Sequence, residues 1–133
     1  MTVLPGGSFT ITRAEQERLV EALGRGVDGD PHPIWAYIAT QRGIGIGVAE
    51  LCALADFDVN DGPMLGSVEL AFSAALELDV EYTVTGEVVG IERKHGRTAG
   101  TFDVLTFRER LVGPDGAEVA STTNTFILPR RDA

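Results

Sequence analysis

Gly43–Ala55 reads GIGIGVAELCALA, and this stretch decides the fold. Glu50 is its single charged residue, although the whole chain contains 11 Lys and Arg and 20 Asp and Glu. Its large apolar side chains are spread around most of a helical wheel, a pattern typical of a helix that is buried on most sides. A helix that crosses a bilayer needs about 20 apolar residues, so this stretch is too short to do so. We therefore expect a central helix over 43–55 that the rest of the chain surrounds.

The composition is that of one ordinary globular domain over 1–133, with 44% hydrophobic and 23% charged residues. The formal net charge of −9, without a basic patch, argues against nucleic acid or a membrane surface as a partner. Cys52 is alone, so no disulfide framework exists and a reducing compartment is expected. Residues 1–10 lack a basic segment followed by an apolar run, so we expect no signal peptide and a cytoplasmic location.

A first helix is predicted upstream of the central one. Thr12 and Glu15 have the capping-box spacing, with a hydroxyl at the N-cap and a carboxylate three residues later. Apolar residues follow at helical spacing, and Gly24 is a natural stop. We expect a helix over 13–23, preceded by a short strand or an extended segment at 8–11.

The segment 27–36, VDGDPHPIWA, is predicted to be a rigid loop, because its two prolines forbid a regular helix. It presents Asp30 and His32 two residues apart, and each could tune the pKa of the other for general acid–base chemistry. The alternative is that the Asp-Gly pair is only a turn and Trp35 only a core residue. We expect no metal site, since the other histidine of the chain, His95, is far away in sequence.

Gly43, Gly45 and Gly47 alternate with apolar residues in a pattern that matches neither a dinucleotide fingerprint nor a phosphate-binding loop, so no nucleotide cofactor is expected. Two explanations stay open. The glycines could leave amides exposed at a helix N-terminus, where they attract a developing oxyanion. Alternatively, they only permit close packing of the helix on a sheet.

The second half of the chain alternates apolar and polar residues, which predicts strands at 68–72, 76–88, 101–112 and 118–128. Even-numbered positions are apolar in the second of these, and the third alternates around Phe102 and Val104. Turns are expected at 93–96 and 113–116. Consecutive strands joined by tight turns make an antiparallel sheet, so the fold class is α+β, one curved sheet wrapped around one long helix.

This arrangement resembles the hotdog fold of MaoC-like (R)-specific enoyl-thioester hydratases and dehydratases over nearly the whole chain. Residues 29–35, GDPHPIW, align without a gap with a signature that reads roughly G-D-x-N-P-apolar-H. Residues 72–76 and 82–88, FSAAL and YTVTGEV, look like the family's strand pair, and 126–130, FILPR, like its last strand.

The resemblance implies a catalytic role for Asp30, but the family's catalytic His falls on Trp35, and His32 stands where the family usually has Asn. An indole is a donor only and cannot accept a proton. Either His32 substitutes as the second catalytic residue, or the chain resembles the substrate-binding half of a two-part dehydratase. The implied acyl-binding residues are Trp35, Tyr37, Gly43, Ile44 and Gly45.

The implied activity is that of a hydro-lyase, or of its substrate-binding subunit, in fatty acid or steroid-type lipid metabolism, with no cofactor. The implied partners are an acyl-CoA or acyl-carrier thioester and either a second copy of the chain or a catalytic MaoC-like subunit. A hotdog thioesterase that uses Asp30 or Glu50 beside the glycines is the first alternative. A non-enzymatic acyl-thioester binding protein is the second.

Overall fold

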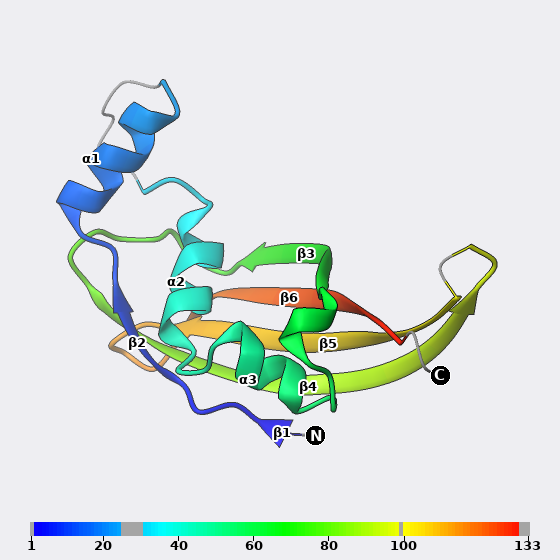
Figure 1. The fold of residues 1–133 in the computed structure, drawn as a ribbon. Helices are drawn as coiled ribbons and strands as arrows, with labels where there is room; N and C mark the ends of the chain where they lie inside the picture. The colour runs from blue at the N-terminus through cyan, green and yellow to red at the C-terminus, as the bar shows by residue number, and fades with distance from the viewer. Residues whose placement is uncertain (1, 25–30, 99, 131–133) are drawn as a thin grey trace.

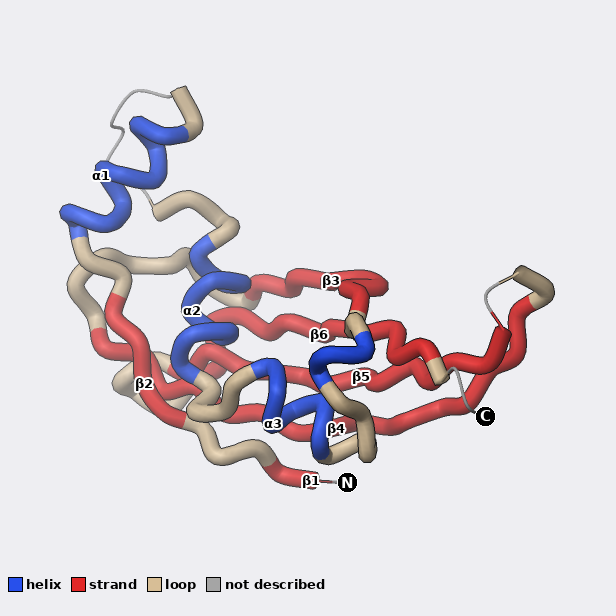
Figure 2. The backbone as a smooth tube through the Cα atoms, viewed as in Figure 1, coloured by secondary structure: helices blue, strands red, loops and turns tan. Residues whose placement is uncertain are grey.

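The computed structural model describes residues 2–24, 31–98 and 100–130. Over these ranges the strands form one antiparallel sheet in the order β1-β4-β5-β6-β3, with β2 also paired with β4. The strands are β1 Thr2–Val3, β2 Gly7–Thr10, β3 Met64–Phe72, β4 Glu81–Gly96, β5 Gly100–Val112 and β6 Glu118–Pro129. The sheet curves around the helices, and the β4–β5 hairpin extends well beyond them (Figures 1 and 2).

The helices are α1 Arg13–Ala22, α2 Trp35–Gly43, α3 Val48–Ala53 and the 3-10 turn η1 Val59–Asp61. Helix α2 contacts β2, β4, β5 and β6, so it lies across the concave face of the sheet. Its buried residues include Ala36, Ala39 and Gly43, whose small size allows the helix axis to come close to the strands. The predicted α+β arrangement of a curved antiparallel sheet around a central helical segment is therefore confirmed.

The central helix, however, is not the continuous element expected over 43–55. Gly43 ends α2 rather than beginning a helix, and α3 starts only at Val48. Between them Gly45 has a φ of 79°, a left-handed conformation that glycine adopts without strain and that interrupts a helix. A Cβ on Gly43 would lie 2.5 Å from Val84 Cγ2. Close packing against Val84 thus explains Gly43, and the left-handed backbone explains Gly45.

Several strand boundaries also differ from the prediction: β3 begins at Met64 rather than at 68, and β4 spans Glu81–Gly96 rather than 76–88. Residues 76–80 belong to the connection between β3 and β4, because Asp79 has a left-handed φ of 59° and its N–H donates to Ile11 O at 2.8 Å. The predicted turn at 93–96 is wrong, since β4 and β5 pair as far as Gly96 and Gly100. The turn at 113–116 is confirmed by the Gly116 N–H bond to Gly113 O.

The face of β5 that meets the core is not the one that carries Phe102 and Val104. Odd-numbered residues of β5 are buried, and Phe102 and Val104 lie on the other face. The buried set on β5 is Asp103, Leu105, Phe107, Glu109 and Leu111. The sequence pattern left the buried face of this strand undecided, because two of its core positions are the acidic residues Asp103 and Glu109.

Helix α1 begins as predicted. Thr12 is the N-cap, its Oγ1 accepts the Glu15 N–H at 3.2 Å, and it also lies 3.1 Å from a carboxylate oxygen of Glu15. The first of these bonds satisfies a backbone N–H of the first turn that would otherwise have no intrahelical partner.

An ion-pair cluster fastens the end of α3 to the sheet. Asp103, 5% exposed, accepts hydrogen bonds from Arg93 Nε and Arg130 Nε, both at 2.9 Å. Arg130 also donates to the carbonyls of Ala55 and Asp56, directly beyond α3. Arg93 and Arg130 hold the pKa of Asp103 below its ordinary value, although burial opposes the shift.

We predict that Asp103→Ala lowers the free energy of unfolding by about 2 kcal/mol, because hydrogen bonds to charged groups contribute roughly 1.5–3 kcal/mol and the remaining arginines stay partly solvated. Urea denaturation checks this value. Glu92→Ala, an exposed acidic residue on β4, is the control and should change stability by less than about 0.5 kcal/mol. Equal effects of the two substitutions would contradict the role given to Asp103.

Candidate functional site

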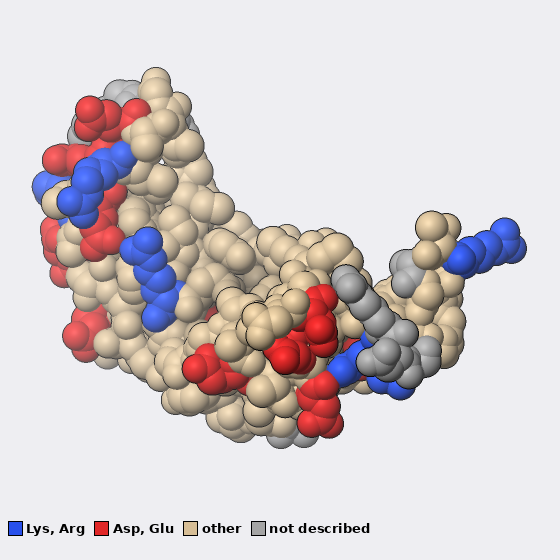
Figure 3. All heavy atoms as spheres, in the orientation of Figure 1, with Lys and Arg blue, Asp and Glu red and all other residues tan. Residues whose placement is uncertain are grey.

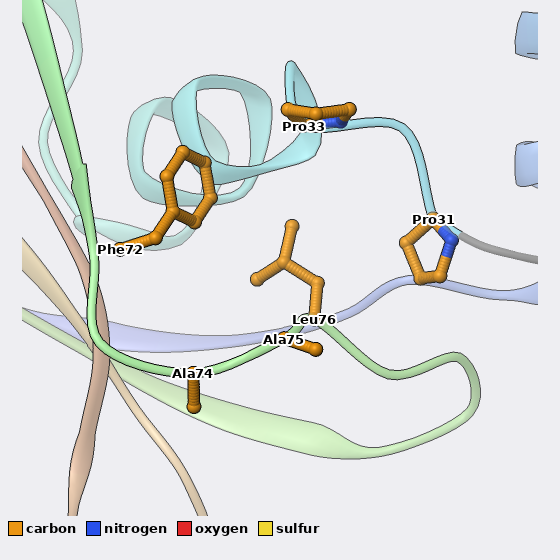
Figure 4. A pocket seen from close by; sticks show the side chains of 6 residues that line it. All are labelled: Pro31, Pro33, Phe72, Ala74, Ala75 and Leu76. Carbon is orange, nitrogen blue, oxygen red and sulfur yellow. The ribbon is translucent and has the colours of Figure 1, made fainter.

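An apolar pocket of about 440 Å³ opens between the segment that precedes α2 and the segment that follows β3. In Figure 4 the ring of Phe72 and the side chain of Leu76 project toward the same space, opposite Pro33. The volume lies within the range of small-molecule sites. The residues that line the pocket are Pro31, Pro33, Phe72, Ala74, Ala75 and Leu76.

The pocket adjoins an unusually apolar sheet edge. β3 is the last strand in the sheet order, and Leu65 and Phe72 are 55% and 46% exposed. Met64 and Leu70 are exposed as well. Figure 3 shows a hollowed, uncharged surface over β3 toward the α2 end of the molecule. An exposed apolar edge strand is a template for pairing with another chain.

One buried side chain holds the wall of the pocket in place. Gln16 of α1, 1% exposed, accepts two hydrogen bonds at Oε1, from the His32 backbone N–H at 3.1 Å and from Trp35 Nε1 at 2.7 Å. The segment at 31–35 contains two prolines that cannot donate, and these bonds tie two of its remaining donors to α1.

Trp35 lies at the start of α2 and is 4% exposed. Its ring lies 6.3 Å from that of Phe9, and it belongs to the main hydrophobic core. It does not line the pocket beside Pro33. In this geometry Trp35 is a core side chain whose indole N–H is hydrogen-bonded. Its role in acyl binding stays a prediction.

His32 is half-buried, and its Nδ1 accepts the Ile34 N–H at 3.1 Å. A neutral imidazole with Nδ1 as acceptor carries its proton on Nε2. In this state the side chain offers a donor and has no free basic nitrogen. Its proposed catalytic partner Asp30, together with Asp28, lies outside the described residues.

The remaining predicted acyl-binding residues do not line the pocket beside Pro33, and their role in acyl binding stays a prediction. Tyr37 is half-buried on α2, and Gly43 and Ile44 are buried at the end of that helix. Gly45 is exposed in the following turn, where Gly6 N–H donates to Ile44 O at 2.7 Å. Ile44 lines a second, smaller cavity rather than the pocket beside Pro33.

The sequence analysis missed Glu109, which is 0% exposed in the middle of β5. Burial raises the pKa of Glu109 to about 8, against the opposing effects of the Gln41 hydrogen bond and of the nearby Thr122 hydroxyl. A carboxyl with this pKa is largely protonated at neutral pH. The available signal was its place in phase with Leu105, Phe107 and Leu111, two residues apart along the strand.

Two structural findings bear on the other expectations. Among the described residues, no group of three or more His, Cys, Asp or Glu side chains could hold a metal ion. No helix in the described part of the chain is long and apolar enough to cross a membrane. Glu50, the alternative thioesterase residue, is exposed in the first turn of α3.

No protein-family model matches the chain, and no curated protein matches its sequence. Solved structures do match its fold. The HadBC complex of Mycobacterium tuberculosis, a 3R-hydroxyacyl-ACP dehydratase, gives a TM-score of 0.68 at 13% identity, covering 95% of this chain and 93% of that one. The ChsH1–ChsH2 complex of the same organism gives 0.70 at 13% identity, covering 96% and 84%.

A third match is smu.793 of Streptococcus mutans, solved with acetyl-CoA bound, with a TM-score of 0.56 at 13% identity over 94% of this chain and 81% of that one. A likeness at this level of identity establishes the fold. The hotdog architecture implied by the sequence resemblance is therefore confirmed. The structures that share it include a dehydratase complex, a hypothetical thioesterase and a thioesterase superfamily protein.

Proposed function

We propose that this chain is the acyl-thioester-binding subunit of a MaoC-like (R)-specific hydratase or dehydratase, and that a partner subunit supplies the complete Asp/His pair. The observation that carries the proposal is Trp35. It aligns with the family's catalytic His. In the structure its indole N–H donates to Gln16 and its ring packs in the hydrophobic core.

The apolar pocket supports the binding half of this proposal. The described residues that line it carry no charged side chain, which suits the hydrocarbon part of a thioester. Phe72 belongs both to this pocket and to the exposed edge strand β3, so a partner that pairs with β3 would close the open side of the pocket. Two structures that share the fold are complexes, the dehydratase HadBC and the ChsH1–ChsH2 complex.

The direct test is crotonyl-CoA hydration by the purified chain, alone and after co-expression with a hotdog protein that carries an intact Asp/His signature. We expect binding of acyl-CoA without turnover for the chain alone, and hydration by the pair. Robust hydration by the chain alone would overturn the non-catalytic assignment. In that case Asp30→Asn and His32→Ala should each abolish the activity.

A thioesterase is the second candidate, because Glu50 is exposed in the first turn of α3 and thioesterases share the fold. Release of free CoA thiol from a panel of acyl-CoAs distinguishes it from hydration, and Glu50→Gln should abolish that release. Thermal protection by acyl-CoA without turnover, with any partner, would instead indicate a non-enzymatic binding protein.

We predict that Leu70→Lys on β3 weakens self-association or association with the partner about 10- to 100-fold, because a buried charge at an interface costs one to three kcal/mol or more. Sedimentation equilibrium measures the change. Val89→Lys is the matched control, since Val89 is 44% exposed and lies on β4. Equal weakening by both substitutions would contradict an interface at β3.

A further inference from the structure

A second cavity, of about 150 Å³, lies beneath the turn between α2 and α3. Most of its wall is hydrocarbon, contributed by Leu4, Ile44, Ile46, Leu51 and Phe107. Gln41 of α2 and Glu109 of β5 are its polar side chains among the described residues. It shares no lining residue with the pocket beside Pro33.

Glu109 gives this cavity a specific chemical character. One carboxyl oxygen, Oε1, accepts from Gln41 Nε2 at 2.7 Å and from Asn124 Nδ2 at 3.3 Å. The other, Oε2, is buried and has no hydrogen-bond partner within the described chain, and the same holds for Asn124 Oδ1. Buried polar groups are nearly always hydrogen-bonded, so an orphan oxygen in the residue that lines a cavity points to a missing partner.

The protonation state decides what that partner can be. With the pKa of Glu109 raised to about 8, the carboxyl is neutral at pH 7 and its unpartnered oxygen can donate an O–H hydrogen bond. The complementary ligand atom is then an uncharged oxygen acceptor, such as a ketone or an alcohol. A carboxylate would bring a second acid against Glu109, and the hydrocarbon wall opposes the burial of any ion.

Cavity size restricts the rest of the ligand. An apolar cavity of about 150 Å³ has room for a six-membered carbon ring such as benzene. Entry is available at the outer wall, where Gly47 is exposed and Val48 is 49% exposed. The ligand class is therefore a compact ring or branched alkyl group that carries one oxygen.

We propose that this cavity is a second binding site, which takes a small uncharged cyclic or branched ketone or alcohol and holds its oxygen through the Glu109 carboxyl. The site is separate from the proposed acyl-thioester pocket and requires neither a partner subunit nor catalysis. A test of this site is therefore independent of a test of the proposed function.

Cyclohexanone and cyclohexane are the probes, because they share a ring and differ in the oxygen. Titration of the full chain at pH 6.5, followed by side-chain amide and methyl NMR signals, should show cyclohexanone binding at least tenfold more tightly, with shifts at Gln41 and Ile44. Glu109→Leu should remove that preference and leave cyclohexane binding unchanged. Glu118→Leu, an exposed residue of β6, should behave as the wild type.

Ile46→Phe, at a half-buried position of the wall, should fill the cavity and abolish binding of both probes. Three results would overturn the proposal: no preference for cyclohexanone in the wild type, tighter binding of cyclohexylamine, or complete displacement of cyclohexanone by crotonyl-CoA. The last would place the probe in the pocket beside Pro33. Should Glu109→Leu not fold, the absence of shifts at Gln41 in the wild type would overturn it as well.

Discussion

The free energy of unfolding of the wild-type chain should fall by about 3 kcal/mol between pH 5 and pH 7.5 relative to a Glu109→Gln variant. The pKa of Glu109 is about 8 in the folded protein, against an ordinary value of 4.5. Between these values the folded chain keeps a proton that the unfolded chain releases. Stability therefore decreases as pH rises, by at most about 1.4 kcal/mol per pH unit.

The pH window is chosen so that other shifted groups stay out of it. The lowered pKa of Asp103 acts below its ordinary value of 3.8, whereas Cys52 and Tyr82 are shifted upward from 9.0 and 10.0. Above pH 8, Glu109 is ionised in both states and its contribution becomes constant. Below pH 4.5 it is protonated in both states, and the stability that its folded-state proton provides is fully present.

Urea denaturation at half-unit steps from pH 5 to pH 8.5 measures the effect, with Glu118→Gln as the control for loss of one carboxylate. The control curve should run parallel to that of the wild type, and the Glu109→Gln curve should diverge from both. A wild-type curve parallel to that of Glu109→Gln over the whole window would show that Glu109 ionises normally, and the neutral hydrogen-bond donor of the second cavity would be lost with it.

The alternation of apolar and polar residues predicted the sheet well, because it follows directly from the burial of one face of a strand. It placed the inward face of β4 correctly, where Tyr82, Val84 and Val88 are buried. The same reasoning did not identify the buried face of β5, since Asp103 and Glu109 occupy core positions there. Burial of an acid depends on partners from distant elements, such as Arg130 and Gln41, which local alternation does not report.

The prediction of a continuous central helix was wrong for a related reason. The apolar character of 43–55 correctly indicated burial, with Leu51 and Cys52 in the core. It could not reveal that Gly45 is left-handed, because that conformation follows from the close approach of the Gly6 carbonyl in a neighbouring segment. Each glycine permits either a helix or a break, and tertiary contacts decide between them.

The candidate site was predictable in part. The two prolines correctly indicated a constrained segment, and Pro31 and Pro33 do line the larger pocket. The opposite wall, at 74–76, comes from the connection after β3, which the alternation pattern assigned in part to a strand. A pocket formed by two segments that are distant in sequence requires the three-dimensional path of both.

Trp35→Ala should destabilise the chain by about 4–5 kcal/mol, the other large effect we expect. Truncation of a buried Trp to Ala costs roughly 3–5 kcal/mol through lost burial and the cavity left behind. The same change deprives Gln16 Oε1 of its bond from Trp35 Nε1. Trp35→Phe keeps most of the ring and loses the donor, so a cost of about 1–2 kcal/mol is expected.

Tyr37→Phe is the matched control on the same helix, since Tyr37 is half-buried, and a change below about 0.5 kcal/mol is expected. The decisive comparison is acyl-CoA affinity under conditions where the variants are folded. If Trp35 acts only through the core and Gln16, the Trp35→Phe variant should bind acyl-CoA within about twofold of the wild-type affinity. The indole does not line the pocket, so we expect the binding free energy to change by about 0.4 kcal/mol or less. A tenfold loss of affinity with normal stability would instead make the indole part of the acyl site. The residue at the position of the family's catalytic His would then serve substrate binding rather than core packing.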